Sequence, residues 1–582
     1  MAVCEGEVLA ASRAGERGRA VARLAAVALT LGTSAVLAIR LDLPAFFDNE
    51  GRYAEVAREM VLRGDWISPH LDFALFLNKP PLTFWLAALV FHFAGPSEWA
   101  RLVSIGAGAV ALFATCRLGA LFYGEAVGLV AGLALGTMLG FVLEARTLRP
   151  DMLVVASVVT VIWCWQAALR AGPRRTGWLV GLYVALGLGM LAKGLVPVVL
   201  AGVPIAIVTL RDDGWRGIGR LRPVLGVAIV LAIVLPWHLA AGLRHDGFFW
   251  DYVVNQHLLF FLNRKLPHDS NGDPLAFFWA AFLGRAAPWA LLLPATLPEA
   301  FRGARPGATA AERATFVVWV WTASVLVFFS LAPSRLEHYS LPALPAAALL
   351  AARVWQRARA GTIAPALWVY AVVVGTVLAV AGAVGLVVGR MLLARTYWIA
   401  QVPEFLELAT PAAATLTLTG ALVALAAARR RPDWLVGAFG AASVAFAVIV
   451  LRAEAAAEPL FSWHPVAHRI ATALPPDTAV IFEAPEEYQL VGGLAFYARR
   501  RIGLLEPPGY VPPTYLVGLT DHMFTSRAEF ERRWRAGERI AFVSDPQRRR
   551  ETPDGLVPEP AHVLGRFGDR WLLASFPPAP AR

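Results

Sequence analysis

The sequence predicts a polytopic α-helical membrane protein with interfacial helices and a small α/β domain at its carboxyl end. Hydrophobic residues make up 57% of the 582 positions and charged residues only 16%, a balance that water-soluble domains do not show. Most apolar residues fall in runs of roughly 20, the length that crosses a bilayer as a helix. Behind the last run, prolines and charged residues return, which is typical of a domain outside the membrane.

Run length and hydropathy predict about thirteen membrane spans. They are residues 21–40, 98–122, 125–145, 151–171, 177–194, 196–210, 222–243, 275–297, 313–332, 339–355, 365–388, 410–428 and 433–451. The net charge is +11, and arginines recur in the short loops between alternate spans. Thirteen spans place these loops on one side, which the positive-inside rule makes cytoplasmic, so the basic character indicates topology rather than nucleic-acid binding.

This topology divides the chain into three parts. We expect a cytoplasmic tail over residues 1–20, a membrane domain over 21–451 and an extracytoplasmic domain over 452–582, in a cell inner or plasma membrane. A cleaved signal peptide is the alternative for residues 1–40, but no small-residue cleavage site follows the apolar run.

The carboxyl-terminal part has the pattern of an α/β domain. Strands are predicted near 479–483 and 539–544, a helix near 527–535 and a hairpin through Gly568-Asp569. The sequence of this domain contains no glycine-rich loop of the kind that binds nucleotide phosphates.

Two long outer loops, 41–97 and 244–274, are where we expect the chemistry. In the first loop, apolar residues from Tyr53 to Val61 recur at helical spacing opposite charged residues. This pattern predicts a short amphipathic helix, lying either on the membrane surface or under other protein. A second apolar segment, from Lys79 to Phe93, is too short to span comfortably and is placed along the interface.

Lysine is nearly absent from the chain. Lys79, Lys193 and Lys265 are the only lysines among 53 basic residues, and the topology places all three at the outer face. A lysine retained where arginine is the rule indicates a site that needs a compact point charge. Lys79 also precedes Pro80-Pro81 at the start of a helix, where an anion such as phosphate would be favoured. The alternative for each lysine is snorkelling towards the lipid headgroups.

Carboxylates follow or begin spans at the same outer face. Asp48 and Glu50 come directly after the first span, and Asp151 begins the fourth. Carboxylates beside lipid are costly unless they are paired or used, so one of them is a candidate general base. The alternative is that Asp48 or Asn49 caps the helix after the first span and that Asp151 caps the fourth span.

Further polar residues complete the candidate site. Arg264 is a second candidate for phosphate binding, and His257 and His268 lie in the same loop. The two histidines match no closed zinc motif, and Cys4, Cys116 and Cys164 have no metal-type spacing, so we expect no metal and no other cofactor.

Several of these residues form a known pattern. The chain resembles the lipid-linked-sugar glycosyltransferases of the GT-C class, in the aminoarabinose transferase and protein O-mannosyltransferase group. The resemblance covers nearly all of the membrane part. Its specific pieces are Asn49-Glu50-Gly51-Arg52-Tyr53-Ala54-Glu55, Arg58-Glu59-Met60, Gly64-Asp65-Trp66, Pro69-His70 and Lys79-Pro80-Pro81-Leu82 with Trp85, and weaker matches are Asp151, Lys193-Gly194, Pro236-Trp237, His257, His268, Arg335 and Tyr339.

The resemblance implies a membrane-embedded cavity open to the outside, an acidic residue near the reacting groups and a lysine on the lipid phosphate. It also implies substrate-pocket roles for Arg52, Tyr53, His257, His268, Arg335 and Tyr339. The chain departs from the family pattern at two positions. Asn49 stands where the family has its first carboxylate, and Asn78 stands where some relatives carry a metal-binding glutamate.

We therefore expect a glycosyltransferase that uses a polyprenyl-phosphate sugar donor. Lys79, Arg264 and Lys193 would bind the donor phosphate, and Asp48, Glu50 or Asp151 would face the acceptor, which is lipid A, another glycan or a protein. The alternative is a transporter or flippase of the same lipid, in which these charges line a pathway and no bond is broken.

Overall fold

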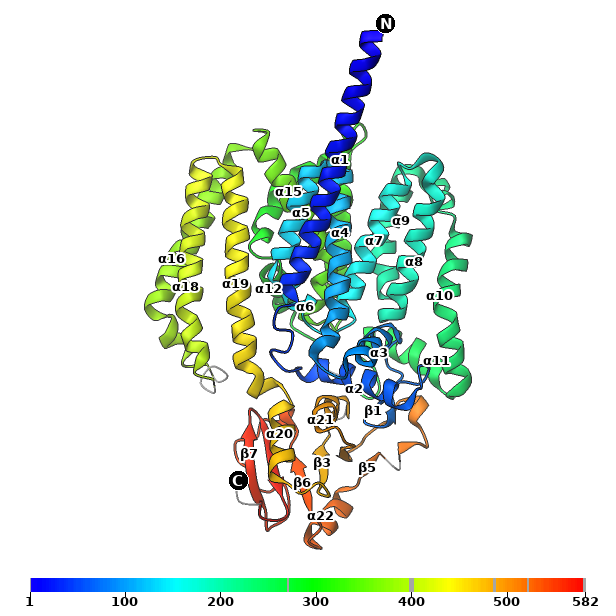
Figure 1. Cartoon of the computed structure of the whole chain (residues 1–582), viewed down its shortest axis with the longest axis vertical. Coiled ribbons are helices and arrows are strands. Elements are labelled where there is room, and N and C mark those ends of the chain that lie inside the picture. The colour runs from blue at the N-terminus through cyan, green and yellow to red at the C-terminus, as the bar shows by residue number, and fades with distance from the viewer. Residues whose placement is uncertain (1, 269–271, 397–401, 485–487, 521–522, 579–582) are drawn as a thin grey trace.

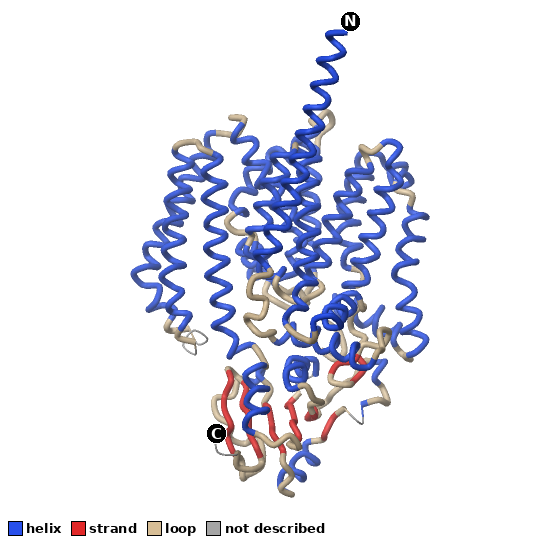
Figure 2. Tube along the Cα trace, in the orientation of Figure 1, coloured by secondary structure: helices blue, strands red, loops and turns tan. Residues whose placement is uncertain are grey.

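The computed structural model describes residues 2–268, 272–396, 402–484, 488–520 and 523–578, and for residues 2–17 and 48 it describes the backbone alone. A broad bundle of long helices occupies one part of the molecule and a sheet domain the other (Figures 1 and 2). The amino-terminal end of the first helix and the sheet domain lie at opposite ends of the bundle (Figure 1).

Within the described residues, nine helices are long and apolar enough to cross a membrane, or up to eleven if each of two bent pairs is one span. The long helices are α1 (Ala2–Leu37), α4 (Leu102–Tyr123, extended by η1, Glu98–Arg101), α7 (Asp151–Ala168), α8 (Arg175–Lys193, preceded by η2, Gly172–Arg174), α10 (Pro223–Arg244), α14 (Ala310–Leu331), α16 (Pro365–Leu393), α18 (Glu404–Ala428) and α19 (Pro432–Phe461). The polytopic helical class is thereby confirmed, whereas the number thirteen is not.

Two predicted spans are bent pairs of helices. Residues 125–145 form α5 (Glu125–Thr137) and α6 (Leu139–Ala145), which meet at 66°, and the backbone of Met138 between them is extended. Residues 275–297 fall on α12 (Leu275–Arg285) and on η4 (Trp289–Thr296) with α13 (Leu297–Gly303), at 102°. Pro288 lies at the second bend, where its missing N–H and its ring disfavour a continuous helix.

Two other predicted spans fall outside the group of nine. Helix α9 (Val196–Arg220) carries Arg211, Asp212 and Asp213 and changes direction at Gly214. Helix α15 (Leu344–Arg359) has 16 residues, fewer than a span of roughly 20 needs. Hydropathy run length alone does not distinguish such helices from spans.

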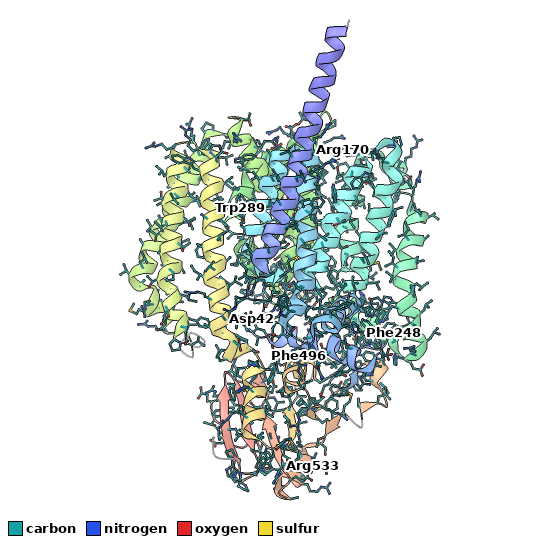
Figure 3. The ribbon with its side chains drawn as sticks, viewed as in Figure 1. Asp42, Arg170, Phe248, Trp289, Phe496 and Arg533 are labelled. Atoms are coloured by element: carbon teal, nitrogen blue, oxygen red, sulfur yellow. The ribbon has the colours of Figure 1, made fainter. Side chains whose placement is uncertain are left out.

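The arginine-rich loops meet at one end of the bundle. Arg175 donates to the backbone carbonyl of Arg220 at 3.0 Å, Arg222 donates to the hydroxyl of Thr176 at 3.0 Å, and Arg359 lies 3.7 Å from Asp433. Arg170 lies at this end of the bundle (Figure 3). The predicted common side of these loops is therefore present in the structure.

Helices α2 (Asp48–Arg63) and α3 (Leu82–Ala94) lie between the bundle and the sheet domain, with the short strands β1 (His70–Leu71) and β2 (Ala74–Leu75) between them in sequence (Figure 1). The apolar face of α2 is buried, but so are Glu55, Arg58 and Glu59 on its polar side. Of the two interpretations of this helix, burial under other protein is the one that the structure shows.

The carboxyl-terminal domain contains, within the described residues, a six-stranded sheet of order β5-β4-β3-β6-β8-β7. Its strands are β3 (Ala479–Glu483), β4 (Gly503–Leu505), β5 (Phe524–Thr525), β6 (Ile540–Val543), β7 (His562–Phe567) and β8 (Arg570–Ala574), and its helical elements are α20 (His464–Ala473), η6 (Tyr488–Leu490), α21 (Val491–Ala498), η7 (Thr514–Leu516), α22 (Arg527–Arg535) and η9 (Pro546–Arg548). Strands β3 to β6 pair in parallel, and β8 joins β6 and β7 antiparallel. The predicted strands, helix and hairpin are all present.

This domain shares a hydrophobic core with the interfacial helices. One cluster of buried side chains runs from Phe46 and Phe84 through Phe248 to Trp463 and Phe496. In Figure 3, Phe496 lies where the domain meets the bundle and Phe248 at the bundle end that faces the domain. The sheet domain is therefore packed into the layer that carries α2 and α3.

Two glycines face each other closely in this interface. A Cβ on Gly51 of α2 would overlap the Cα of Gly493 of α21. Gly51→Ala should therefore force the helices apart and destabilise the protein by about 1–3 kcal/mol, seen as a lower Tm in detergent. Gly437→Ala in α19, whose Cβ would meet nothing within 4 Å, is the matched control and should leave the Tm unchanged or slightly higher. An equal Tm for both variants would contradict a tight α2–α21 contact.

Candidate active site

A cavity of about 430 Å³ lies at the end of the bundle nearest the sheet domain, where the loop before α3 meets α7, α8 and the segment after α10. Its lining is mostly apolar, and the charged or polar side chains among its walls are few. They are Asn78, Lys79, Asp151, Lys193, Tyr252, Gln256, His257, Ser334 and Tyr339. Charges in an apolar chamber interact more strongly than in water, because solvent screens them less.

One wall carries a carboxylate–ammonium pair. Asp151 begins α7 and Lys193 ends α8, and the Lys193 Nζ lies 2.5 Å from Asp151 Oδ1. The His338 Nε2 lies 3.9 Å from the same carboxylate oxygen, and the centroid of the Tyr339 ring lies 4.7 Å from the Lys193 Nζ. The pairing satisfies both charges and fixes their positions.

Lys79 is distant in sequence from this pair and lies in the loop that leads into α3. Its Nζ is 5.7 Å from the centroid of the Phe260 ring, and the side chain is partly buried. Pro80 and Pro81 follow it and α3 begins at Leu82, as the sequence predicts. The amino-terminal end of α3 therefore points the positive end of its dipole towards the same region as the ammonium group.

The third wall is a π-helix, η3 (Asp251–Leu259), which follows the short α11 (Phe248–Trp250). π-Helical turns are rare in proteins, and those that occur lie frequently at functional sites. In η3 the Nδ1 of His257 lies 2.6 Å from the carbonyl of Tyr252, and the backbone N–H of Leu195 donates to Nε2 at 3.2 Å. The proton is therefore on Nδ1 and His257 is neutral, in agreement with burial, which lowers its pKa.

Gly194 is required beside this histidine. Its φ of +67° lies in the left-handed region, and a Cβ there would overlap His257 Nε2. The Lys193-Gly194 pair thus couples the end of α8 to η3, which brings two walls of the cavity together.

Glu50 lies away from the cavity, in an ion pair of its own. Its carboxylate accepts from Arg101 at 2.9 and 2.7 Å and from the backbone N–H groups of Leu148 at 2.8 Å and Phe47 at 3.3 Å. Burial raises the pKa of Glu50, but the Arg101 guanidinium and these hydrogen bonds outweigh burial and hold the pKa below its ordinary value. Glu50 is therefore ionised, and its oxygens are directed at protein groups.

The structure brings together five of the twelve predicted site residues, namely Lys79, Asp151, Lys193, His257 and Tyr339. The side chain of Asp48 lies outside the described residues. The remaining six predicted residues do not line this cavity: Glu50, Arg52, Tyr53, Arg264, His268 and Arg335. Arg52 contacts Gln489, Tyr53 stacks on Phe84, Arg264 is exposed, and Arg335 donates to backbone carbonyls including that of Asp273.

Gln256 also lines the cavity, although the sequence did not single it out. No sequence signal marks it, because the π-helical repeat puts residues on a face that α-helical or strand periodicity does not predict.

Three comparisons with known proteins fit this arrangement. The family model described as dolichyl-phosphate-mannose-protein mannosyltransferase matches residues 78–239. Undecaprenyl phosphate-alpha-4-amino-4-deoxy-L-arabinose arabinosyl transferases are similar in sequence: that of Serratia proteamaculans is 29% identical over 320 residues, covering 52% of this chain and 54% of the relative, and transferase 2 of Proteus mirabilis is 28% identical over 313 residues with the same coverage. The chain thus spans about half the length of these curated relatives.

The similarity to solved structures extends over nearly the whole chain. The crystal structure of ArnT from Cupriavidus metallidurans bound to undecaprenyl phosphate superposes with a TM-score of 0.76 at 23% identity, covering 95% of this chain and 97% of ArnT. The chain has the GT-C fold of ArnT. The oligosaccharyltransferase AglB from Archaeoglobus fulgidus is more distant, with a TM-score of 0.51 at 11% identity, covering 90% of this chain and 69% of AglB.

Proposed function

We propose that the chain is a glycosyltransferase that moves a sugar from an undecaprenyl-phosphate-type donor to lipid A. The observation that carries the proposal is the cavity in which Lys79, Lys193 and Asp151 come together on the ArnT fold. Two further findings support the proposal: the sequence is similar to arabinosyl transferases, and the similar ArnT structure contains bound undecaprenyl phosphate.

In this mechanism, the ammonium group of Lys79 binds the donor phosphate. The bond between the anomeric carbon and the phosphate oxygen breaks, and the polyprenyl phosphate leaves with the bonding electrons. Negative charge grows on that oxygen, so a fixed cation beside it lowers the barrier. An acceptor oxygen attacks the anomeric carbon from the opposite face, and one inversion without a covalent glycosyl-enzyme is sufficient.

The Asp151–Lys193 pair bears on the nature of the acceptor. A hydroxyl acceptor needs a base to take its proton, whereas an ionised phosphate needs none. A carboxylate held by an ammonium at 2.5 Å is a weak base, because the cation stabilises its ionised form. We therefore propose an ionised phosphate group of lipid A as the acceptor, with Lys193 neutralising it and Asp151 holding Lys193 in place.

The proposal assigns positive charge to lysines and uses no metal ion. We also propose that the arginine-rich end of the bundle is cytoplasmic and that the cavity and the sheet domain face the other side of the inner membrane. Both substrates would then meet at the outer face.

The test is transfer by the purified full chain in liposomes that contain undecaprenyl-phosphate-linked aminoarabinose and lipid A. Mass spectrometry should show lipid A heavier by one sugar together with free undecaprenyl phosphate. Movement of the intact donor across the bilayer with neither product would overturn the proposal in favour of a transporter.

A further inference from the structure

In the part of the chain that the structure describes, four hydrogen bonds connect the sheet domain to the segments that lead into two walls of the cavity. Three of them hold the loop that leads to Lys79, at residues spaced by three. The backbone N–H of Ile502 donates to Asp72 at 2.9 Å, the hydroxyl of Tyr488 donates to the carbonyl of Leu75 at 3.3 Å, and the hydroxyl of Tyr515 donates to the side-chain carbonyl of Asn78.

The fourth bond holds the wall that contains the π-helix. The hydroxyl of Thr514 donates to the carbonyl of Gly247 at 2.8 Å, directly before α11 and η3. Gly247 has a φ of +77°, and a Cβ there would meet Thr514, so the two segments are in close contact. Adjacent residues of η7 therefore hold both walls.

The position of Tyr515 gives it particular influence over Lys79. Tyr515 and Asn78 are 3% and 5% exposed, so their hydrogen bond forms away from water, where a lost partner costs most. Lys79 lies between Asn78 and Pro80, and the proline ring restricts its own φ and the conformation of the residue before it. Pro80-Pro81 restrict the Lys79 backbone on its carboxyl side, and the hydrogen-bonded Asn78 holds it on its amino side.

We infer that Tyr515 is a positioning residue for the phosphate site: its hydroxyl holds Asn78 so that the Lys79 ammonium faces the donor phosphate. The sheet domain thereby sets the affinity of the membrane cavity for a phosphorylated lipid. This inference rests on the proposed role of Lys79 and adds to it a residue more than 400 positions away in sequence.

The inference is tested by comparing binding of undecaprenyl phosphate with binding of undecaprenol, which has the same chain and no phosphate. Tyr515→Phe removes the hydroxyl alone. It should weaken binding of undecaprenyl phosphate about tenfold and leave binding of undecaprenol unchanged, because only the charged headgroup depends on the placement of Lys79. In the Lys79→Ala background the same change should have no further effect on either ligand.

The matched control is Tyr370→Phe, which removes a hydroxyl that donates to the carbonyl of Leu291 at 3.2 Å, away from the cavity lining. It should bind both lipids like the wild type. If Tyr515→Phe binds undecaprenyl phosphate normally, or weakens both lipids equally, the positioning role is wrong. If Lys79→Ala itself binds undecaprenyl phosphate normally, the proposed phosphate site fails, independently of Tyr515.

Discussion

Lys79→Ala is expected to reduce sugar transfer from the polyprenyl-phosphate donor by a factor of about 100 to 1,000, the usual effect of removing one group that stabilises transition-state charge. The Lys79 ammonium lines an apolar cavity, so no solvent cation replaces it fully. The release of free undecaprenyl phosphate in liposomes, followed by mass spectrometry, measures the loss. Lys79→Arg should retain part of the activity, because it keeps the charge but changes its shape and reach.

Arg244→Ala provides the control for Lys79. Arg244 ends α10, and its side chain is half exposed and lies 3.5 Å from Asp65. An exposed pair of this kind contributes little, so transfer should stay near the wild-type rate. Turnover by Lys79→Ala at the control rate would remove this residue from the mechanism.

Arg101→Met is expected to lower the stability of the whole protein by about 3–5 kcal/mol, since it leaves the Glu50 carboxylate buried without its cation. The two side chains are 3% and 4% exposed, and their closest oxygen–nitrogen distance is 2.7 Å. Arg101 also donates to the carbonyls of Leu41 at 2.9 Å and Pro44 at 2.7 Å, so it connects η1 to the segment between α1 and α2. The Tm in detergent should fall markedly.

Glu50→Gln in the Arg101→Met background distinguishes a charge effect from lost packing. The amide carbonyl can still accept from one of the two N–H groups that donate to separate Glu50 oxygens, those of Leu148 and Phe47, and no buried charge remains, so part of the Tm should return. Arg40→Ala, which removes an ion pair with Asp42 whose side chains are 67% and 60% exposed, is the control and should change stability by less than about 1 kcal/mol. A Tm for Arg101→Met equal to that of Arg40→Ala would contradict the structural role of the buried pair.

From the sequence, Glu50 is a reasonable candidate for catalysis. In the structure it lies outside the cavity lining and pairs with Arg101. A carboxylate directly after a span must be paired or used, and the sequence cannot say which. Its partner Arg101 lies 51 positions further on, at the start of another helix. Only the packing of η1 against the segment before α2 brings that guanidinium to Glu50.

The same reasoning separates Lys79 from Arg264. Lys79 is marked by the scarcity of lysine in the whole chain and by the prolines that start α3. Neither signal depends on tertiary contacts, so the sequence alone predicts that this lysine lies at the start of a helix. Arg264 was selected for its charge and its loop alone. Its direction depends on the turn that ends η3, and its side chain is exposed in the structure.

The sequence by itself determined the helical membrane class, the common side of the arginine-rich loops, the strands of the last domain and the start of α3 at Pro80-Pro81. These features follow from composition, apolar run length and local backbone restriction, which act over a few residues to one span. The tertiary structure alone decided that α2 is buried on both faces, that two apolar runs bend, and that the candidates which line one cavity with Lys79 are Asp151, Lys193, His257 and Tyr339. Those outcomes depend on contacts between residues tens to hundreds of positions apart, and hydropathy and periodicity hold no information about such pairs.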